Sequence, residues 1–339
     1  MVIESSRHYY GRIPELPSGF NVQEVRVAGN RGTCGGVEMT LAAVQQIMEV
    51  VPSGIDIWTT NTPINFPPAF EKYGERLKSA GGDMSNVPDG AILIISAHGS
   101  PPDLYQRARE KNVFVIDTTC PIVLDEQKKV RETAAAGTPI VYLGEENHPE
   151  TIGIKGQVPD GAEMVVFDPS SPIPEDAYIP EDAKLFVKTT NDPDKNQARA
   201  KELEARTNID TSRILPCYAL RNRYAAGKAL TGVDFWIVVG DKSSNNARGL
   251  RDLAIEKQIP SSLIGKPEEI DWSVFTPNIR IIGLTAAAST PEEFTQRALD
   301  EFRLLGIHVV ELPQVMEEIP RIFRMPRKQL AALELRFAQ

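Results

Sequence analysis

The chain has 339 residues, of which 41% are hydrophobic and 24% charged, and its formal net charge is −9 at pH 7. These values are typical of a soluble globular protein with a large core, and the acidic charge argues against a nucleic-acid-binding scaffold. No stretch approaches the ~18 apolar residues of a membrane span, and the opening segment MVIESSRHYYGRIPELPSGF lacks the apolar region of a signal peptide. We therefore expect a cytoplasmic protein whose partners include neither a membrane nor a nucleic acid.

Short β-branched runs alternate with amphipathic segments along the chain. The predicted strands are, in order, VQEVRVAG, AILIISAHG, NVFVIDTTC, PIVYLG, DFWIVVG and IRIIGLTA. The predicted helices span residues 37–51, 123–136, 195–207, 224–231, 246–257 and 291–305, and the segment TPEE at 290–293 predicts a capping box for the last of them. Such alternation predicts parallel sheets covered by helices, with ligands bound at the carboxyl ends of the strands.

Three cysteines are spread almost evenly along this pattern. Cys34 follows the strand VRVAG through a short turn, Cys120 ends NVFVIDTTC, and Cys217 ends the apolar run SRILPC. A predicted helix follows each of them. The spacing predicts three similar α/β units, each of which offers one thiol at its strand ends. Buried thiols that act as small apolar residues are the alternative interpretation.

The predicted organisation has five parts. These are an N-terminal extension (1–22), α/β units at 35–119, 120–216 and 217–320, and a C-terminal tail (321–339), with the strand segment 23–34 joining the third unit. The stretch DPSSPIPEDAYIPED at 168–182 is rich in Pro, Ser and acidic residues, which predicts a surface loop.

The cysteine pattern favours a metal centre. An odd, sparse set of cysteines without an export signal does not predict disulfides, and the absence of a C-x-x-C motif argues against a redox pair. Three thiolates would leave one iron of a cluster without a protein ligand, and such an iron is a Lewis-acid and electron-transfer site for an oxygen-bearing substrate. Zinc held by three cysteines and a water is the competing interpretation.

Polar side chains gather at the ends of the predicted strands. They are His98, His148, Glu150, Thr189, Ser243, Ser244, Asn245 and Ser289. Hydroxyl and amide groups at helix N-termini, together with two histidines, suit a phosphate or diphosphate, and Glu150 is a candidate proton donor. The alternative is that Ser243, Asn245 and Ser289 only cap helices and that Glu150 is an exposed first-turn carboxylate.

Taken together, these segments resemble the 4-hydroxy-3-methylbut-2-enyl diphosphate reductase family, also called the LytB or IspH family, over about residues 25–327. The matching pieces occur in the family's order and at similar spacing. They are NRGTCGGV, ISAHGSP, VIDTTCPIV, NHPETIGIKGQ, KTTND, CYALRNR, GDKSSNNARGL and LTAAASTPEEF.

The resemblance implies an α/β fold in which three similar units with mainly parallel sheets form a trefoil-like arrangement around a central [4Fe–4S] cluster. Cys34, Cys120 and Cys217 would hold the cluster, and its fourth iron would bind the hydroxyl of the substrate. Two electrons and protons would remove that hydroxyl to form isopentenyl and dimethylallyl diphosphates. A ferredoxin or flavodoxin-type protein would supply the electrons.

The resemblance also implies roles for individual residues. Glu150 would relay a proton to the leaving hydroxyl, and Thr189 would hold a water or hydroxyl near the cluster. Ser244 would lie beside the substrate. The residues that would bind the diphosphate are His98, His148, Ser243, Asn245 and Ser289.

Part of the family's substrate site is altered in this chain. Ile64 stands where the family has a diphosphate-binding histidine, Lys188 replaces a glutamine, Ala287 replaces a glycine, and Thr33 replaces a phenylalanine. A hydrogen bond to a charged oxygen contributes about 1.5–3 kcal/mol, so its loss would weaken binding by roughly one to two orders of magnitude. Two further hypotheses follow: a paralogue that reduces or dehydrates another anionic small molecule, and a non-catalytic cluster-binding sensor.

Overall fold

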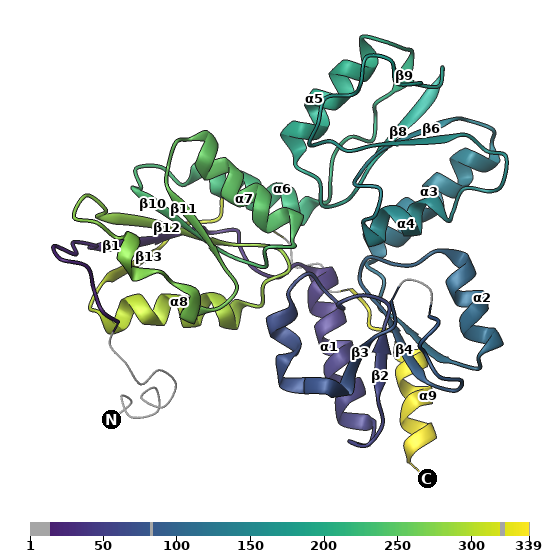
Figure 1. Cartoon of the computed structure of the whole chain (residues 1–339), viewed down its shortest axis with the longest axis horizontal. Coiled ribbons are helices and arrows are strands. Elements are labelled where there is room, and N and C mark those ends of the chain that lie inside the picture. The colour runs from purple at the N-terminus through teal and green to yellow at the C-terminus, as the bar shows by residue number, and fades with distance from the viewer. Residues whose placement is uncertain (1–13, 82–83, 319–322, 339) are drawn as a thin grey trace.

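A computed structural model describes residues 14–81, 84–318 and 323–338. The N-terminal extension predicted for residues 1–22 lies for the most part outside these ranges. The described residues form three α/β units that surround a common centre (Figure 1). Every strand pairing in them is parallel. The predicted fold class, three α/β units with parallel sheets in a trefoil-like arrangement, is confirmed.

The first unit has a four-stranded sheet in the order β3–β2–β4–β5. Its strands are β2 (Ile57–Thr59), β3 (Leu77–Ser79), β4 (Ile92–Ile95) and β5 (Phe114–Asp117). Its helices are α1 (Gly35–Val50), the 3₁₀ helix η1 (Pro67–Arg76) and α2 (Pro102–Glu110). All four residues of β4 are buried, which explains why this strand is continuously apolar in sequence.

The second unit has a four-stranded sheet in the order β7–β6–β8–β9. Its strands are β6 (Ile140–Leu143), β7 (Met164–Phe167), β8 (Ala183–Val187) and β9 (Ile209–Asp210). Its helices are α3 (Pro121–Ala135), α4 (Pro149–Lys155) and α5 (Pro193–Glu204).

The third unit has a five-stranded sheet in the order β11–β10–β12–β1–β13. Its strands are β1 (Glu24–Val27), β10 (Phe235–Val239), β11 (Ser261–Ile264), β12 (Ile281–Ala286) and β13 (His308–Glu311). Its helices are α6 (Tyr218–Ala229), α7 (Asn245–Glu256), α8 (Glu292–Leu304) and the 3₁₀ helices η2 (Pro267–Glu269) and η3 (Trp272–Val274). Strand β1 comes from the start of the described chain and lies between β12 and β13.

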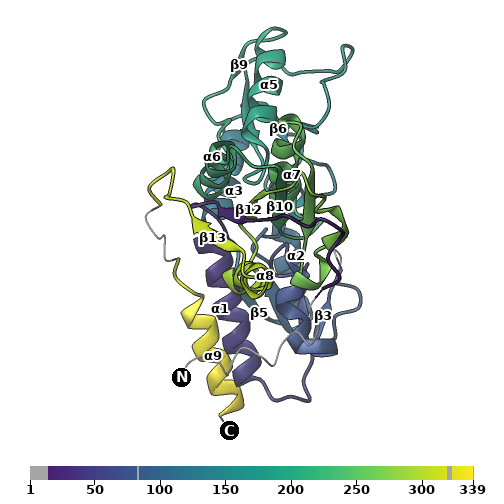
Figure 2. The same ribbon diagram turned by 90° about the vertical axis from the view of Figure 1, so that its left-hand side faces the viewer.

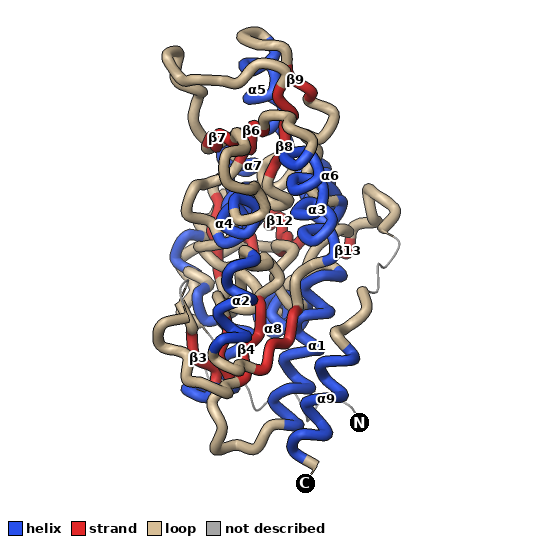
Figure 3. Tube along the Cα trace, turned by 90° about the vertical axis from the view of Figure 1, so that its right-hand side faces the viewer, coloured by secondary structure: helices blue, strands red, loops and turns tan. Residues whose placement is uncertain are grey.

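The C-terminal helix α9 (Arg327–Phe337) leaves the third unit and packs beside α1 of the first unit. Figure 2 and Figure 3 show α1 and α9 side by side from opposite sides of the molecule. In the described ranges, no helix combines the length and the apolar character that crossing a membrane requires.

Two local expectations about strand and helix ends are wrong. The run before Cys217 is not a strand, because β9 ends at Asp210 and the following residues form no ladder. The capping box is also absent. The Thr290 hydroxyl donates to the carbonyl oxygen of Val239 at 3.0 Å, and α8 starts at Glu292 without a side-chain cap. Helices α2, α4 and α9 had no predicted counterpart.

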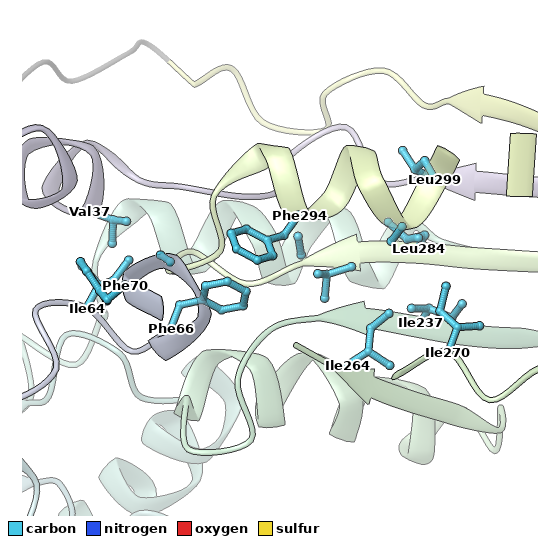
Figure 4. Close-up of a cluster of buried hydrophobic side chains, with 14 of the residues drawn as sticks. Val37, Ile64, Phe66, Phe70, Ile237, Ile264, Ile270, Leu284, Phe294 and Leu299 are labelled. Atoms are coloured by element: carbon cyan, nitrogen blue, oxygen red, sulfur yellow. The ribbon is translucent and has the colours of Figure 1, made fainter. Parts of the chain in front are cut away.

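The largest hydrophobic cluster joins the first and third units. Val37, Ile64, Phe66 and Phe70 come from the first unit, and they belong to the same cluster as residues of β10, β12 and α8 (Figure 4). The rings of Phe66 and Phe294 meet edge to face with their centroids 4.8 Å apart. This apolar contact orients the two units around the central cavity.

Replacing Phe66 with alanine should lower the free energy of unfolding by about 3–5 kcal/mol, because it removes a fully buried ring and leaves a cavity between the units. Urea unfolding followed by circular dichroism measures this change. The exposed Tyr178→Ala variant is the control and should change stability by less than about 0.5 kcal/mol. A loss below about 1 kcal/mol for Phe66→Ala would show that this contact does not stabilise the fold.

Candidate active site

A cavity of about 90 Å³ lies where the three units meet. All three cysteines line it. Its other polar lining residues are Asn65, His98, Glu150, Thr189, Thr190, Tyr218, Ser244, Asn245, Asn246 and Ser289. Its apolar walls include Val37, Ile64, Leu220 and Phe323. The cavity therefore combines thiols, an acid and hydrogen-bond donors with apolar surface that excludes water.

The three cysteines occupy equivalent positions. Each immediately precedes a helix: Cys34 precedes α1, Cys120 precedes α3 and Cys217 precedes α6. Their backbone N–H groups donate to the carbonyl oxygens of Ala288, Ala97 and Thr189 at 3.1, 3.0 and 3.0 Å, respectively. Ala288, Ala97 and Thr189 lie just beyond the ends of β12, β4 and β8, respectively. Each acceptor therefore belongs to a different unit from the helix that follows its cysteine. Each thiol is thus held at a junction between two units.

Protein burial disfavours free thiolates at these positions. Burial raises the pKa of Cys34, and it raises the pKa of Cys120 and of Cys217 to about 12. Mutual repulsion contributes, because Cys34 raises the pKa of both other thiols, whereas backbone N–H groups at the helix starts lower the pKa of all three. A metal centre reverses this balance, because it supplies the positive charge that the thiolates need.

The donor set fits a cluster. Within the described ranges, no three Cys, His, Asp or Glu side chains are placed to hold one metal ion together. In a cluster, each thiolate binds a different metal atom, so the sulfurs need not converge on one point. The absence of a side chain at Gly36 leaves space for the sulfur of Cys120. A Cβ atom added at Gly36 would lie 2.7 Å from the sulfur of Cys120, so only glycine fits there.

Arg223 ties the Cys34 loop to the helix that follows Cys217. Its guanidinium, 2% exposed, donates to the carbonyl oxygens of Gly32 and Thr33 at 3.0 and 2.9 Å. It also pairs with Glu318 at 2.7 Å. Because Arg223 lies on α6, this network holds two of the three cysteine segments in a fixed relation, and its positive charge lowers the pKa of both thiols.

Glu150 is a buried acid, and the alternative of an exposed first-turn carboxylate is wrong. It lies in the first turn of α4, is 1% exposed, and accepts hydrogen bonds from the N–H and the hydroxyl of Thr189 at 2.7 and 2.9 Å. Burial raises the pKa of Glu150 to about 7, although the Thr189 N–H and Lys188 lower it. A carboxyl with this pKa can hold or release a proton near neutral pH.

The two predicted histidines meet edge to face, with ring centroids 5.4 Å apart. Burial and the nearby charge of Lys188 lower the pKa of His98 to about 4 and that of His148 to about 2, so both rings are neutral at pH 7. His148 Nδ1 accepts the N–H of Glu150 at 3.1 Å, which leaves the proton on Nε2. His98 lines the central cavity, whereas His148 lines an adjoining polar pocket.

The predicted anion-binding groups fall into two places. Ser244, Asn245 and Ser289 line the central cavity. Ser243 does not: it is exposed, donates to Asp241 and faces the adjoining pocket that also contains His148. The capping alternative fails for Ser243 and Asn245, because the cap of α7 is Ser244, whose hydroxyl oxygen accepts the N–H of Ala247 at 3.3 Å. It fails for Ser289, because α8 has no side-chain cap and the Ser289 hydroxyl donates to the carbonyl oxygen of Asn65 at 3.0 Å.

Three positions where this chain departs from the family pattern are fully buried: Ile64, Lys188 and Ala287. Ile64, 1% exposed, forms part of the apolar wall. Lys188 pairs with Glu145, which also accepts a hydrogen bond from Asn245 at 2.6 Å. Sequence reasoning did not assign a role to Glu145, Asn246 or Arg223, although the last two lie within the quoted segments GDKSSNNARGL and CYALRNR.

Three parallel α/β units that close on one cavity, with three thiols and a buried acid in its walls, define a class of three-unit oxidoreductases with a thiol-lined centre. The chain belongs to the LytB protein family, whose family model matches residues 25–303. The predicted family is therefore confirmed.

Known relatives resemble the chain over almost their whole length. This chain is 31% identical over 310 residues to a 4-hydroxy-3-methylbut-2-enyl diphosphate reductase of Histophilus somni (strain 2336). The matched region covers 90% of this chain and 98% of that protein. The chain is 30% identical over 317 residues to the reductase of that name from Burkholderia pseudomallei (strain 1026b), with 91% and 98% covered. The structure of the E-1-hydroxy-2-methyl-but-2-enyl-4-diphosphate reductase from Plasmodium falciparum matches with a TM-score of 0.80 and 26% identity, over 93% of this chain and 99% of that one. These names support an oxidoreductase over the predicted alternative of a non-catalytic sensor.

Proposed function

We propose that this chain is a 4-hydroxy-3-methylbut-2-enyl diphosphate reductase, which removes the substrate hydroxyl to form isopentenyl and dimethylallyl diphosphates. The observation that supports this most directly is the burial of Glu150 and Thr189 in the same cavity as the three thiols. A proton donor and a redox centre that share one cavity can act on the same carbon–oxygen bond. The reaction consumes two electrons and two protons and releases water.

The cofactor of this proposal is a [4Fe–4S] cluster held by Cys34, Cys120 and Cys217. When bound, such a cluster supplies electrons one at a time and an iron that can act as a Lewis acid toward an oxygen ligand. A ferredoxin or flavodoxin-type protein would reduce it, and the cytoplasm remains the expected compartment.

The side chains of the cavity have separable tasks in this proposal. Glu150 holds the proton that the leaving hydroxyl takes up, and the two hydrogen bonds from Thr189 orient its carboxyl. Neutral His98 can donate a hydrogen bond to a diphosphate oxygen without carrying a charge. The apolar walls exclude water, which strengthens each of these polar interactions.

The test is an anaerobic assay of the cluster-loaded chain with reduced methyl viologen as electron donor. We expect oxidation of the dye that depends on added 4-hydroxy-3-methylbut-2-enyl diphosphate. The control omits the substrate. No substrate-dependent oxidation by a fully loaded cluster would contradict the proposal.

Activity should depend on pH through Glu150. Because its pKa is raised to about 7, the protonated, proton-donating form predominates below pH 7 and is lost as the pH rises through that value. We therefore expect kcat/KM to be constant on the acid side and to fall about tenfold per pH unit above pH 7. An initial-rate profile between pH 5.5 and 9 measures this. A profile that rises through pH 7 would show that Glu150 does not act as an acid.

A second candidate is the reduction or dehydration of another anionic small molecule by the same centre. The apolar Ile64 in the cavity wall favours it, because the family uses a histidine there for diphosphate recognition. Complementation of a strain that lacks its isoprenoid reductase separates the two candidates. Growth would count against this second one.

A further inference from the structure

Lys188 carries a buried positive charge next to the central cavity. It directly follows β8 and precedes Thr189, which lines the cavity, and its own side chain is 0% exposed. Its Nζ atom pairs with the carboxylate of Glu145, the only hydrogen-bond partner of that atom among the described residues. A lysine is almost never buried this completely unless its charge is paired. The ion pair therefore accounts for how the charge is held, but not for why the chain has a charge there.

The charge of Lys188 acts on both histidines of the site. After burial, which is the larger cause, the charge of Lys188 lowers the pKa of His98 and that of His148. Both rings are neutral at pH 7, and Arg248, another cation that acts on His148, is exposed to solvent. Lys188 is therefore the buried source of positive charge for an anion that binds in the central cavity against His98.

Glu145 connects this charge to the cavity wall. One of its carboxylate oxygens accepts a hydrogen bond from Lys188, and the other accepts one from Nδ2 of Asn245 at 2.6 Å. Asn245 lines the central cavity and also two adjoining polar pockets, both of which Glu145 lines as well. An anion beside Asn245 is thus one side chain away from a carboxylate that repels it, and the ammonium group of Lys188 compensates this repulsion.

Ile64 and Lys188 depart from the family pattern in opposite senses. Ile64 places an apolar side chain in the cavity wall where the family has a histidine, and so removes a hydrogen bond to an anion. Lys188 places a cation where the family has a neutral glutamine. Electrostatic attraction extends over several ångströms where water is excluded and needs no direct contact. The charge of Lys188 can therefore offset part of the affinity that the exchange at Ile64 removes.

We propose that Lys188 is a specificity-determining residue whose charge favours an anionic substrate in the central cavity, and that Glu145 is a positioning residue that limits this charge and holds Asn245. The inference rests on the proposed function for the identity of the anion. The observation that carries it is a fully buried ammonium group that a single carboxylate connects to the cavity wall.

Two substitutions that break the same ion pair separate a charge effect from a purely structural role. Lys188→Gln removes the cation and leaves the carboxylate of Glu145 near the anion, so the affinity for inorganic diphosphate should fall by about ten- to a hundredfold. Glu145→Gln keeps an oxygen for the Asn245 amide but removes the negative charge, so the affinity should rise by about three- to tenfold. The affinity of the double variant should lie between those of the two single variants.

Isothermal titration calorimetry of the anaerobically reconstituted full chain with inorganic diphosphate measures these dissociation constants. Lys266→Gln and Glu71→Gln break a more exposed lysine–glutamate pair outside the cavity, and both variants should bind like the parent. If the buried pair serves only the fold, Lys188→Gln and Glu145→Gln will change the affinity in the same direction or not at all, and the inference is overturned. If Lys188→Gln does not fold, Glu145→Gln decides alone, because an unchanged or weaker affinity would overturn the inference. A parent chain that binds no diphosphate would also overturn it.

The outcome can be distinguished from that of the proposed function. If the parent chain reduces no 4-hydroxy-3-methylbut-2-enyl diphosphate but the two variants change the diphosphate affinity in opposite directions, the inference stands and the proposed function fails. If the parent turns over and both variants bind diphosphate like the parent, the inference alone fails. In a catalytically active parent, we expect Lys188→Gln to raise KM more than it lowers kcat.

Discussion

Replacing Cys120 with alanine should abolish both metal binding and turnover. Alanine keeps the small apolar volume but removes one of only three thiols in the chain. Residues around metal ligands typically contribute about 10–100-fold to metal affinity, and loss of a ligand itself should cost more. We expect the same result for Cys34→Ala and Cys217→Ala, because the three thiols have equivalent positions at the unit junctions.

Iron and sulfide analysis after anaerobic reconstitution measures this effect, with the visible absorption of the cluster as a second readout. The parent chain reconstituted in parallel is the reference, and thermal unfolding of the metal-free proteins checks that each variant folds. The result also decides between the two interpretations of the cysteines. If the thiols were only small apolar packing residues, the alanine variants would retain the metal content of the parent.

Replacing Glu150 with glutamine should lower kcat by a factor of about 10²–10⁴, the usual contribution of a positioned general acid. Glutamine keeps the shape of the side chain and can still accept the Thr189 N–H, so the cavity should be preserved. It cannot supply a carboxyl proton. Steady-state kinetics with reduced methyl viologen measure the loss, and the remaining activity should no longer fall as the pH rises through 7.

Glu132→Gln is the matched control, because it makes the same chemical change on an exposed part of α3. Its kcat should equal that of the parent. Iron content should be unchanged in both variants, since Glu150 holds no metal in this proposal. Retention of more than about a tenth of the parent's kcat by Glu150→Gln would exclude Glu150 as the proton donor.

The fold was largely predictable from local patterns. Strands such as β4 and β10 are buried along their whole length, so their sequences are continuous apolar runs, and the alternation with helices predicted parallel sheets. The predictions of a strand before Cys217 and of a helix cap at Thr290 were wrong, because hydrogen-bond partners from other segments determine both features. The run before Cys217 has an apolar sequence, but Leu215 is 64% exposed and no neighbouring strand pairs with it. Thr290 has the sequence of a helix cap, but its hydroxyl bonds to a neighbouring strand instead.

By itself, the sequence determined the chemical groups of this protein: three thiols at regular spacing, an acid after a strand, and hydroxyl and amide groups at helix starts. Only the tertiary structure decided the burial, the pKa values and the hydrogen-bond partners of these groups. Tertiary packing buries Glu150 and so raises its pKa. Asn246 Oδ1 accepts the N–H of Ala288, which is distant in sequence, while its Nδ2 has no hydrogen-bond partner among the described residues. Burial and hydrogen-bond partners arise from contacts between segments distant in sequence, and a local pattern contains no information about them.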